Sequence, residues 1–317
     1  YTRGIYLIIS SNQSITNFLP NESIGGDFIQ FKESQGYDVE VWTVSEISAE
    51  ELRQDILAFY DDNPLLEYVL LIGDVNAAGY TIPTFTIPSI NENELDVTDY
   101  NYTYSDDPLN PHFLIGRWSV RSLTEMWKVK AKTIQYTRMD NIDDYSYLNR
   151  ALLVAGNFSG DDVLPNDWPV TPVWTSKWLQ DELEGIGYSN IDTAFFHQGN
   201  YTEGDINPLV ANSWNSGVGI INYRGWGDAN GWHKPYFHKE EIGLLNPSWQ
   251  LPIVFSFVCN TGDFGNDFGG IGLPQCFGEI LTNEGDSFSS PKGAAAMIGP
   301  SDLDTDTRYN NVICGAM

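Results

Sequence analysis

Apolar positions along the chain fall into short continuous runs, separated by polar stretches with helical spacing. IYLIIS at residues 5–10, YVLLIG at 68–73 and FLIGRWSV at 113–120 are predicted strands, because runs of this length are typical of strands buried on both faces. Between the first two of these strands, Ser48 and Glu51 have the spacing of a capping box, which predicts the start of a helix. Alternation of strands and helices predicts a parallel sheet covered by helices.

The alternation is interrupted and then restarts. Residues 77–111 form an acidic, aromatic loop region, and the polar run 140–149 predicts a boundary between two units. The strands predicted beyond that run are ALLVAG, IDTAFF, GVGIINY, PIVFSFV and GAAAMIG. We therefore expect an α/β fold of two successive open, mostly parallel sheets flanked by helices, divided into residues 1–146 and 147–317.

Composition and charge narrow the class of protein. An apolar fraction of 42% in 317 residues is ample for a packed core. The 16 Lys and Arg residues stand against 43 Asp and Glu, and the net charge of −27 opposes binding to phosphate backbones, so we expect no nucleic-acid partner. The sequence has no run of about eighteen apolar residues, so we also expect no membrane span. Three cysteines cannot all pair with one another, which argues against a disulfide scaffold.

Two of the predicted strands run into unusual chemistry. GVGIINY continues into RGWGDANGWH at residues 224–233, and PIVFSFV continues into Cys259 and the small residues Asn-Thr-Gly-Asp. Ligand sites of open α/β sheets lie off the carboxyl ends of the strands. A thiol there, followed by small residues with accessible N–H groups, suits a nucleophile with an oxyanion hole. The alternative for Cys259 is a small buried hydrophobic residue.

These blocks resemble the gingipain family of cysteine peptidases, which belongs to the caspase-like clan. The resemblance rests on NYRGWG at 222–227 and on Cys259 followed by x-x-Gly-Asp-Phe. LLIGD at 70–74, FLIGRWSV with its following helix, and QCFGEIL followed by GAAAMIG occur in the family's order. The resemblance implies a caspase-like α/β fold, Cys259 as the nucleophile, and Gly227 as the glycine whose N–H helps to bind the oxyanion.

The family's catalytic histidine has no counterpart at its usual position, which Trp226 occupies, and an indole cannot accept a proton. In one interpretation His233 replaces it, because Gly225, Gly227 and Gly231 allow a compact loop that turns the imidazole toward Cys259. In a second, the chain is a pseudopeptidase that keeps the fold without the base. In a third, the base is His238, His112 or His197.

The resemblance also indicates where substrate side chains would bind. Gingipains accept basic side chains through an acidic residue after the first strand of the second unit, where this chain has Asp161, Asp162 and Asp167. The family's acidic residue that orients the histidine would fall near Asn157 or Phe158, so Asp161 or Asp162 is the candidate replacement. Trp226 and Trp232 are either core residues or walls of the substrate cleft.

Two acidic loops are candidates for calcium, because hard oxygen ligands crowded on a flexible loop suit this ion. The first contains Asp96, Asp99, Asp106, Asp107 and Asn110, and the second contains Asp302, Asp304 and Asp306. Gingipain relatives commonly carry structural calcium. The alternative is a solvated acidic face, which is usual in a strongly acidic protein. No cofactor is expected for catalysis.

The resemblance predicts a secreted cysteine endopeptidase, located outside the cell or on its surface, that cleaves protein or peptide substrates. Cys259 would be the nucleophile, His233 the general base, and the N–H groups of Gly227 and Cys259 the oxyanion donors. The alternative is a catalytically inactive surface or assembly module that uses the fold for binding. Because the family continues beyond GAAAMIG, the remainder of its own precursor is a further expected partner.

Overall fold

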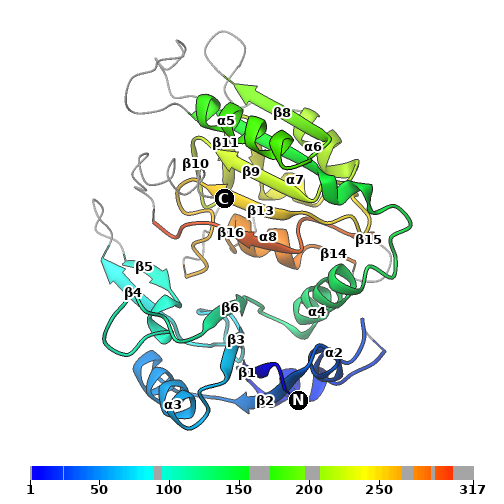
Figure 1. Ribbon diagram of the computed structural model, residues 1–317. Coiled ribbons are helices and arrows are strands. Elements are labelled where there is room, and N and C mark those ends of the chain that lie inside the picture. The colour runs from blue at the N-terminus through cyan, green and yellow to red at the C-terminus, as the bar shows by residue number, and fades with distance from the viewer. Residues whose placement is uncertain are drawn as a thin grey trace. The chain divides into compact units, whose positions relative to one another are not determined.

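The computed structural model describes residues 2–23, 25–88, 95–156, 172–196, 208–265, 274–286 and 290–302. They form two compact units (Figure 1). The first unit takes the described residues up to Pro88 and Leu95–Ile134, and the second takes those from Gln135 onward. The division falls within helix α4 (Leu123–Arg138), whereas the polar run at 140–149 was the predicted boundary.

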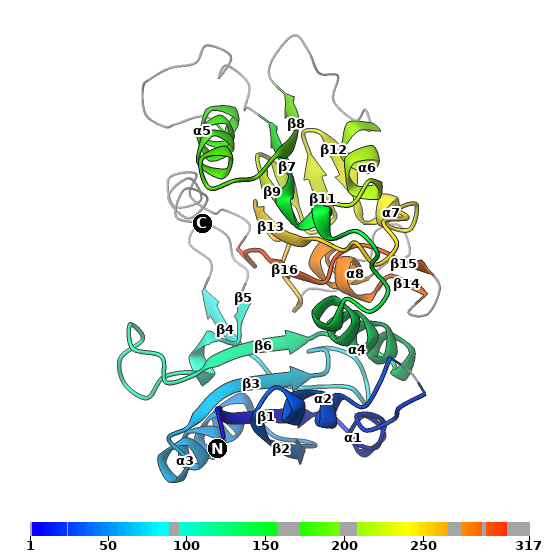
Figure 2. The same ribbon diagram turned by 45° about the vertical axis from the view of Figure 1, so that its right-hand side comes forward.

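The first unit is built on a parallel four-stranded sheet with the order β2-β1-β3-β6 (Figure 2). Its strands are β1 (Gly4–Ser10), β2 (Tyr37–Thr43), β3 (Leu66–Ile72) and β6 (Leu114–Trp118). Successive side chains of β1 enter different clusters, with Ile8 in one and Leu7 in the other. The continuous apolar runs therefore reflect burial of the central strands on both faces.

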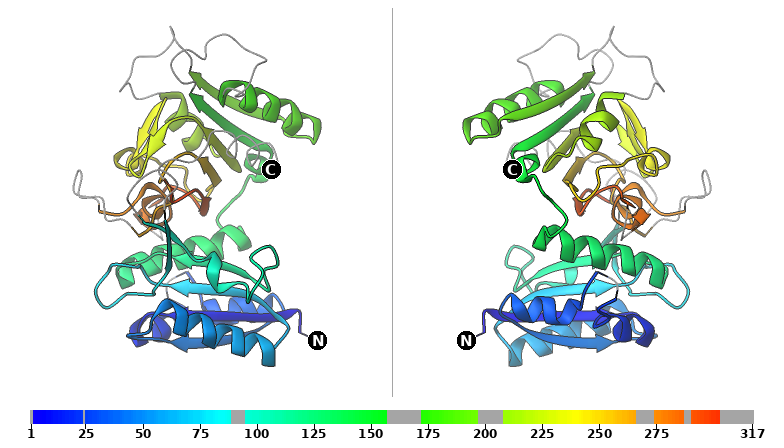
Figure 3. Two further views of the ribbon diagram at one scale, coloured as in Figure 1. Left: turned by 90° about the vertical axis from the view of Figure 1, so that its left-hand side faces the viewer. Right: turned by 90° about the vertical axis from the view of Figure 1, so that its right-hand side faces the viewer.

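Helices cover both faces of this sheet (Figure 3). Residues of α1 (Gln13–Phe18), α2 (Phe28–Ser34) and α4 pack in the cluster that contains Ile8. Residues of α3 (Ala49–Asp62) pack in the other cluster. The predicted capping box opens α3, since Glu51 N donates to Ser48 Oγ at 3.2 Å and Ser48 N donates to Glu51 Oε2 at 3.0 Å.

The acidic, aromatic loop region contains structure that the sequence pattern did not predict. Within residues 77–111, strands β4 (Phe85–Pro88) and β5 (Leu95–Thr98) form an antiparallel pair, and a 3₁₀ turn, η1, covers Tyr100–Tyr102. Arg117 on β6 holds this region through both carboxylate oxygens of Asp99, at 2.7 and 2.8 Å. A bidentate, nearly buried ion pair thus anchors the loop to the sheet.

The second unit is built on a parallel five-stranded sheet with the order β16-β13-β9-β7-β8 (Figure 1). Its strands are β7 (Arg150–Gly156), β8 (Asn190–Phe196), β9 (Ile220–Arg224), β13 (Ile253–Phe257) and β16 (Ala296–Ile298). A short antiparallel pair, β14 (Gly285–Asp286) and β15 (Ser290–Pro291), and a 3₁₀ turn, η2 (Tyr145–Asn149), complete its irregular parts.

Helices flank this sheet as well. Leu179 of α5 (Pro172–Gly185) packs with Leu153 and Phe257 on one side. Side chains from α6 (Pro208–Asn215), α7 (Lys239–Ile242) and α8 (Phe277–Asn283) join the larger cluster that contains Ile221 and Val254. Two open parallel sheets flanked by helices confirm the predicted fold class. None of the helices in the described part of the chain is long and apolar enough to cross a membrane.

Candidate active site

The second sheet brings the two unusual strand ends together. β9 and β13 are parallel neighbours whose last paired residues are Arg224 and Phe257. Arg224 is buried, and its guanidinium donates to the carbonyl oxygens of Gly225 at 3.1 Å and Phe257 at 3.4 Å. Because this cation bonds to both strand exits, the loop with Trp226 and the turn with Cys259 leave the sheet side by side.

A small antiparallel sheet follows β9 and was not predicted. It has the order β10-β11-β12, with β10 at Gly227–Asp228, β11 at Gly231–His233 and β12 at Tyr236–His238. Side chains alternate between the two faces of a strand. One face therefore carries the apolar Trp232 and Phe237, and the other carries the polar residues of the candidate site.

Trp232 belongs to the core. Its side chain is fully buried, its ring stacks on Tyr223 at 4.5 Å between centroids, and its Nε1 donates to Ser256 Oγ at 2.9 Å. Of the two alternatives for Trp232, this burial corrects the one in which it lines a substrate pocket and agrees with the one in which it is a core residue. The Trp232 indole thus packs the three-stranded sheet against β9, through Tyr223, and against β13, through Ser256, and its one hydrogen-bond donor is satisfied.

Trp226 is instead 46% exposed, which is compatible with its predicted place at a substrate cleft. His233 lies directly across from it, since His233 N donates to the Trp226 carbonyl at 2.8 Å. The two rings are perpendicular, with centroids 6.3 Å apart. Side chains of directly opposite residues project to the same face. His233 is thus the cross-strand neighbour of the position that holds the histidine in gingipains.

His233 lies between two polar partners on this face. Its Nε2 is 3.4 Å from Asp228 Oδ2, and its Nδ1 is 3.2 Å from His238 Nε2. Burial alone would raise the pKa of Asp228. The hydrogen bonds from His233 and the Asn230 N–H, together with the charges of His233 and His238, have the larger effect, so the pKa of Asp228 is lowered. Burial and the charge of His233 lower the pKa of His238. The arrangement favours an ionised carboxylate beside His233 and a neutral second imidazole.

Asp228 is the member of this array that sequence reasoning missed. A partial signal was available, because Asn-Gly, here Asn230 and Gly231, is typical of hairpin turns, although the observed two-residue turn is Ala229 and Asn230. The observed register, Asp228 opposite Gly231 and Gly227 opposite Trp232, places Asp228 diagonal to His233. Diagonal neighbours on one face lie within reach of long side chains. Recognition of a hairpin here places Asp228 and His233 on neighbouring strands, and the register in the structure then sets their contact.

Cys259 is a partly buried free cysteine just beyond β13. The next residue, Asn260, has a φ of 49°, in the left-handed region that non-glycine residues rarely adopt. Asn260 N donates to the Asp302 carbonyl at 3.0 Å, and Asn260 Nδ2 donates to the Ser301 carbonyl at 2.8 Å. These bonds fix the turn after Cys259, and they compensate for a strained backbone of the kind that clusters at active sites.

Gly227, the predicted oxyanion donor, is the first residue of β10. Hydrogen-bonded and non-hydrogen-bonded residue pairs alternate along an antiparallel ladder. Because His233 bonds to Trp226 directly across from it, the next pair, Gly227 with Trp232, is a non-hydrogen-bonded pair. The N–H of Gly227 consequently points away from β11. A Cβ on Gly227 would collide with the Gly231 carbonyl oxygen and would lie 3.3 Å from Val258 Cγ1. The position thus requires glycine and adjoins the exit of β13.

The remaining candidates are placed as follows. Cys276 is buried at the start of α8, and its burial and the nearby Glu279 raise the pKa of its thiol, as expected for a structural cysteine. His112 belongs to the first unit, where its ring stacks on Tyr60 and its Nε2 lies 2.9 Å from Ser105 Oγ. Several predicted residues lie outside the described part of the chain: Asp161, Asp162, Asp167, His197, Asp304, Asp306 and Cys314.

Some of the candidate calcium ligands in the first acidic loop have protein partners. Both carboxylate oxygens of Asp99 are bonded to Arg117, and Asp107 Oδ1 accepts from Leu109 N at 3.0 Å. Among the residues that the structure covers, no group of three or more His, Cys, Asp or Glu side chains is arranged to hold a metal ion. Asp106 and Asn110 of this loop are exposed. Calcium binding by the first loop, and by the second loop, which begins at Asp302, stays a prediction.

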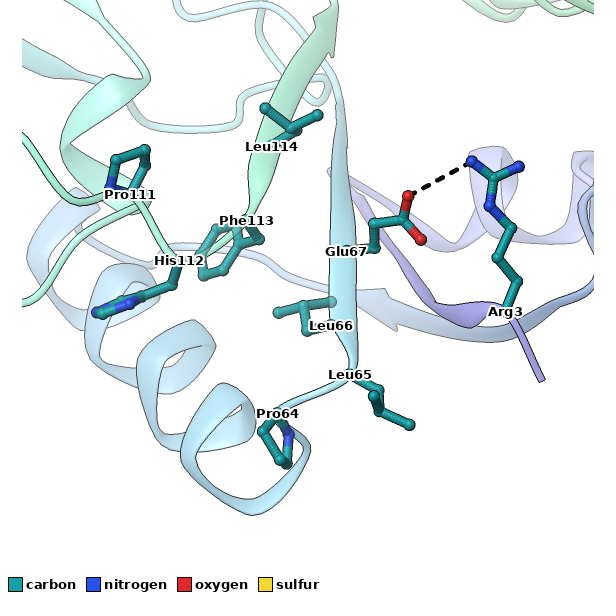
Figure 4. A pocket seen from close by; sticks show the side chains of 9 residues that line it. All are labelled: Arg3, Pro64, Leu65, Leu66, Glu67, Pro111, His112, Phe113 and Leu114. Carbon is teal, nitrogen blue, oxygen red and sulfur yellow. Dashed lines mark ion pairs between the residues drawn. The ribbon is translucent and has the colours of Figure 1, made fainter. Parts of the chain in front are cut away.

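The first unit has an open pocket of about 380 Å³ at the amino-terminal ends of its strands (Figure 4). Its lining comes from the amino-terminal ends of the strands: Arg3, Pro64, Leu65, Leu66, Glu67, Pro111, His112, Phe113 and Leu114. Ligand sites in open parallel sheets lie off the carboxyl ends instead. The pocket therefore does not belong to the candidate site around Cys259.

Sequence comparison finds relatives among the gingipains. Gingipain R2 of Porphyromonas gingivalis is 27% identical over 277 residues, which are 86% of this chain and 34% of that protein. Gingipain R1 of the same species is 27% identical over 277 residues, or 25% of its length. The chain thus spans a quarter to a third of the length of these two relatives.

Solved structures show the same fold. The crystal structure of the Arg-specific cysteine proteinase gingipain R matches with a TM-score of 0.78 at 23% identity, over 99% of this chain and 68% of that chain. A complex of the pro- and mature domains of the Porphyromonas gingivalis enzyme matches with a TM-score of 0.77 at 23% identity, over 98% of this chain and 69% of that one. The family model described as Peptidase family C25 matches residues 2–316. The chain belongs to peptidase family C25.

Proposed function

We propose that this chain is a cysteine endopeptidase in which Cys259 is the nucleophile and His233 transfers the proton. The observation that supports it most is the cross-strand position of His233. Its imidazole lies opposite the place of the family's histidine, with a carboxylate on Nε2, beside the strand exit that carries Cys259. A nucleophile, a base and a group that orients the base are the parts that such catalysis requires.

The proposed reaction follows from these groups. The Cys259 thiol loses its proton to the His233 ring, and the thiolate adds to the peptide carbonyl carbon. The N–H groups of Gly227 and Cys259 stabilise the resulting oxyanion. His233 then returns the proton to the amide nitrogen as the C–N bond breaks, which leaves a thioester on Cys259. Water, deprotonated by His233, hydrolyses the thioester and regenerates the thiol.

For substrates we propose peptides with basic side chains at the cleavage site. The gingipain R structure is described as Arg-specific. The net charge of −27 would steer cationic peptides toward this protein. Asp161, Asp162 and Asp167 are the candidates for the acidic pocket residue. We place the protein outside the cell or on its surface, with the remainder of its own precursor as a further partner.

The second candidate function is an inactive binding module. It is favoured by Trp226, whose exposed indole stands where gingipains carry a proton-accepting imidazole and lies 5.3 Å from Lys234 Nζ. It is also favoured by the bonding of both His233 nitrogens to Asp228 and His238, because a base needs a free lone pair when it accepts a proton.

A peptide library analysed by mass spectrometry separates the two functions. The wild-type protein should cleave, with enrichment of Arg and Lys before the cut, and Cys259→Ala should abolish cleavage. Cys276→Ala is the matched control, since that thiol is buried at a helix start, and it should retain cleavage once its fold is verified by circular dichroism. A wild-type protein that cleaves nothing, while it still binds peptides, would favour the binding module.

A further inference from the structure

The hydroxyl of Tyr223 lies at the centre of the loop that leads from β9 into the small antiparallel sheet. Tyr223 belongs to β9, and its side chain is fully buried. Its Oη lies 2.7 Å from the Trp226 carbonyl oxygen and 3.1 Å from the Lys234 carbonyl oxygen, and it accepts a hydrogen bond from Trp226 N at 3.1 Å. A phenol has one proton, and the shorter distance assigns it to the Trp226 carbonyl. One hydroxyl thus holds the backbone of Trp226 through both its N–H and its carbonyl.

The surroundings of this hydroxyl fix its position. A Cβ on Gly225 would lie 2.6 Å from Tyr223 Oη, so a side chain at residue 225 would displace the hydroxyl or the loop. The Tyr223 ring stacks on the buried Trp232 with an angle of 8° between the ring planes. Because the ring is held in the core and the glycine leaves room beside it, the hydroxyl has a defined direction toward the loop.

The Trp226 carbonyl sets the direction of the N–H that follows it, which is that of Gly227. This carbonyl accepts from the Tyr223 hydroxyl and, at 2.8 Å, from His233 N. The peptide bond between Trp226 and Gly227 is trans, and in a planar trans peptide the N–H points opposite to the C=O. Two donors on the carbonyl therefore aim the Gly227 N–H to the other side, away from β11.

We propose that Tyr223 is a positioning residue for the oxyanion donor Gly227. Hydrogen bonds to a peptide carbonyl polarise the whole amide group, which makes its N–H a stronger donor. The Tyr223 hydroxyl therefore both orients the Gly227 N–H and strengthens its bond to the oxyanion that forms when the thiolate adds to the substrate carbonyl. This inference rests on the proposed function for its effect on cleavage, but not for the orientation of the peptide group.

NMR reads the state of this peptide group without any substrate. Trp-Gly occurs once in the sequence, so protein labelled with carbonyl-¹³C tryptophan and ¹⁵N glycine gives one carbonyl-amide cross-peak, that of Trp226 and Gly227. Tyr223→Phe removes the hydroxyl and keeps the ring. Because the carbonyl then loses a hydrogen bond, its ¹³C resonance and the Gly227 ¹⁵N resonance should both move upfield. Tyr147→Phe is the matched control, since it removes a buried hydroxyl that has no hydrogen-bond partner in the described part of the chain, and it should leave the cross-peak in place. An unmoved cross-peak in a folded Tyr223→Phe would overturn the proposal.

Kinetics supplies the second readout. Removal of a whole oxyanion donor costs roughly 10²–10³-fold in kcat. Tyr223→Phe leaves the Gly227 N–H in place but less well oriented and less polarised, so kcat should fall by about tenfold with KM nearly unchanged, because the oxyanion forms only during the reaction. Tyr147→Phe should keep the wild-type kcat. A raised KM at unchanged kcat would contradict the proposal. If the wild-type protein cleaves no peptide, the proposed function fails, and the cross-peak still decides whether Tyr223 holds the peptide group.

Discussion

The carboxyl ends of the two parallel sheets differ in how their polar groups are used. In the first unit, β3 is followed by the buried Asp74, whose Oδ1 accepts from Asn76 N at 2.5 Å and whose Oδ2 lies 3.7 Å from Arg121 Nε. Beside it, Arg117 is bonded to Asp99 and to the Gly73 carbonyl. These contacts join loops to strands.

In the second unit the corresponding edge is partly open. Cys259 is partly exposed, the His233 side chain is 29% exposed, and Trp226 is 46% exposed. Their partners orient them without covering them. Two sheets of the same class thus differ in chemistry because of a few residues after the strands, so the fold alone does not locate the function. The comparison predicts structural effects in the first unit and catalytic effects in the second.

The largest expected effect belongs to the second unit. His233→Ala should lower kcat/KM by roughly 10³-fold or more, nearly as much as Cys259→Ala, because a nucleophile and its base act as a unit. The double variant should be no worse than Cys259→Ala alone. Peptide hydrolysis by the three purified proteins checks this. Independent, multiplicative losses would mean that the two residues do not work as a pair.

In the first unit we expect a change of comparable size in the free energy of unfolding, rather than in catalysis. Arg117→Ala leaves the Asp99 carboxylate without its guanidinium partner and should destabilise the unit by about 3–5 kcal/mol. Arg121→Ala is the matched control, since Arg121 is more exposed and its contact is longer, and it should cost about 1 kcal/mol or less. Urea unfolding measures both. Equal losses for the two variants would contradict a structural role specific to Arg117.

Much of the fold could be predicted from residue patterns, for an identifiable reason. Strands such as β1 and β7 are continuous apolar runs because helices cover both faces of their sheets, and this leaves a clear sequence signal. The three-stranded sheet after β9 gives no such signal, since β10 has only 2 residues and β11 and β12 have 3 each. Strands this short are specified by the turn and by tertiary packing of Trp232 and Phe237.

The site could be predicted only in part, for the same reason. Cys259 and Gly227 follow recognisable strands, so their motifs were visible. The contact between Asp228 and His233 depends on the register of the small hairpin, and the pairing of His233 with His238 depends on the next strand as well. The choice between core and cleft wall for Trp232 stayed open in the sequence, because its burial depends on which face of β11 it occupies.

A third prediction tests whether an imidazole at position 226 can take the place of the one at position 233, directly across the hairpin. In the inactive His233→Ala background, Trp226→His should restore about tenfold of the lost kcat/KM, because it returns an imidazole to the family's position on the same face. The indole is 46% exposed, so its loss should cost about 1 kcal/mol or less. No rescue in a folded double variant would show that the two positions do not serve the same site.

The smallest expected effect is a pH dependence of stability. The pKa of His238 lies below its ordinary value of 6.5, so the unfolded chain binds this proton more readily than the folded one. The stability associated with neutral His238 is present above pH 6.5 and is lost as the pH falls through its lowered pKa. Urea unfolding between pH 7 and pH 5 should show this loss, and His238→Gln should reduce it. A steeper loss in the variant would contradict the assignment.

The central claim, that His233 activates Cys259, is tested most directly by the alkylation rate of the Cys259 thiol. Iodoacetamide labelling, followed by peptide mass spectrometry, gives this rate in the wild type and in His233→Ala, with the buried Cys276 as the internal reference. We predict that Cys259 reacts far faster than Cys276 at pH 7 and that His233→Ala slows it by at least about tenfold. Equal Cys259 rates in the two proteins would contradict the pairing of these residues.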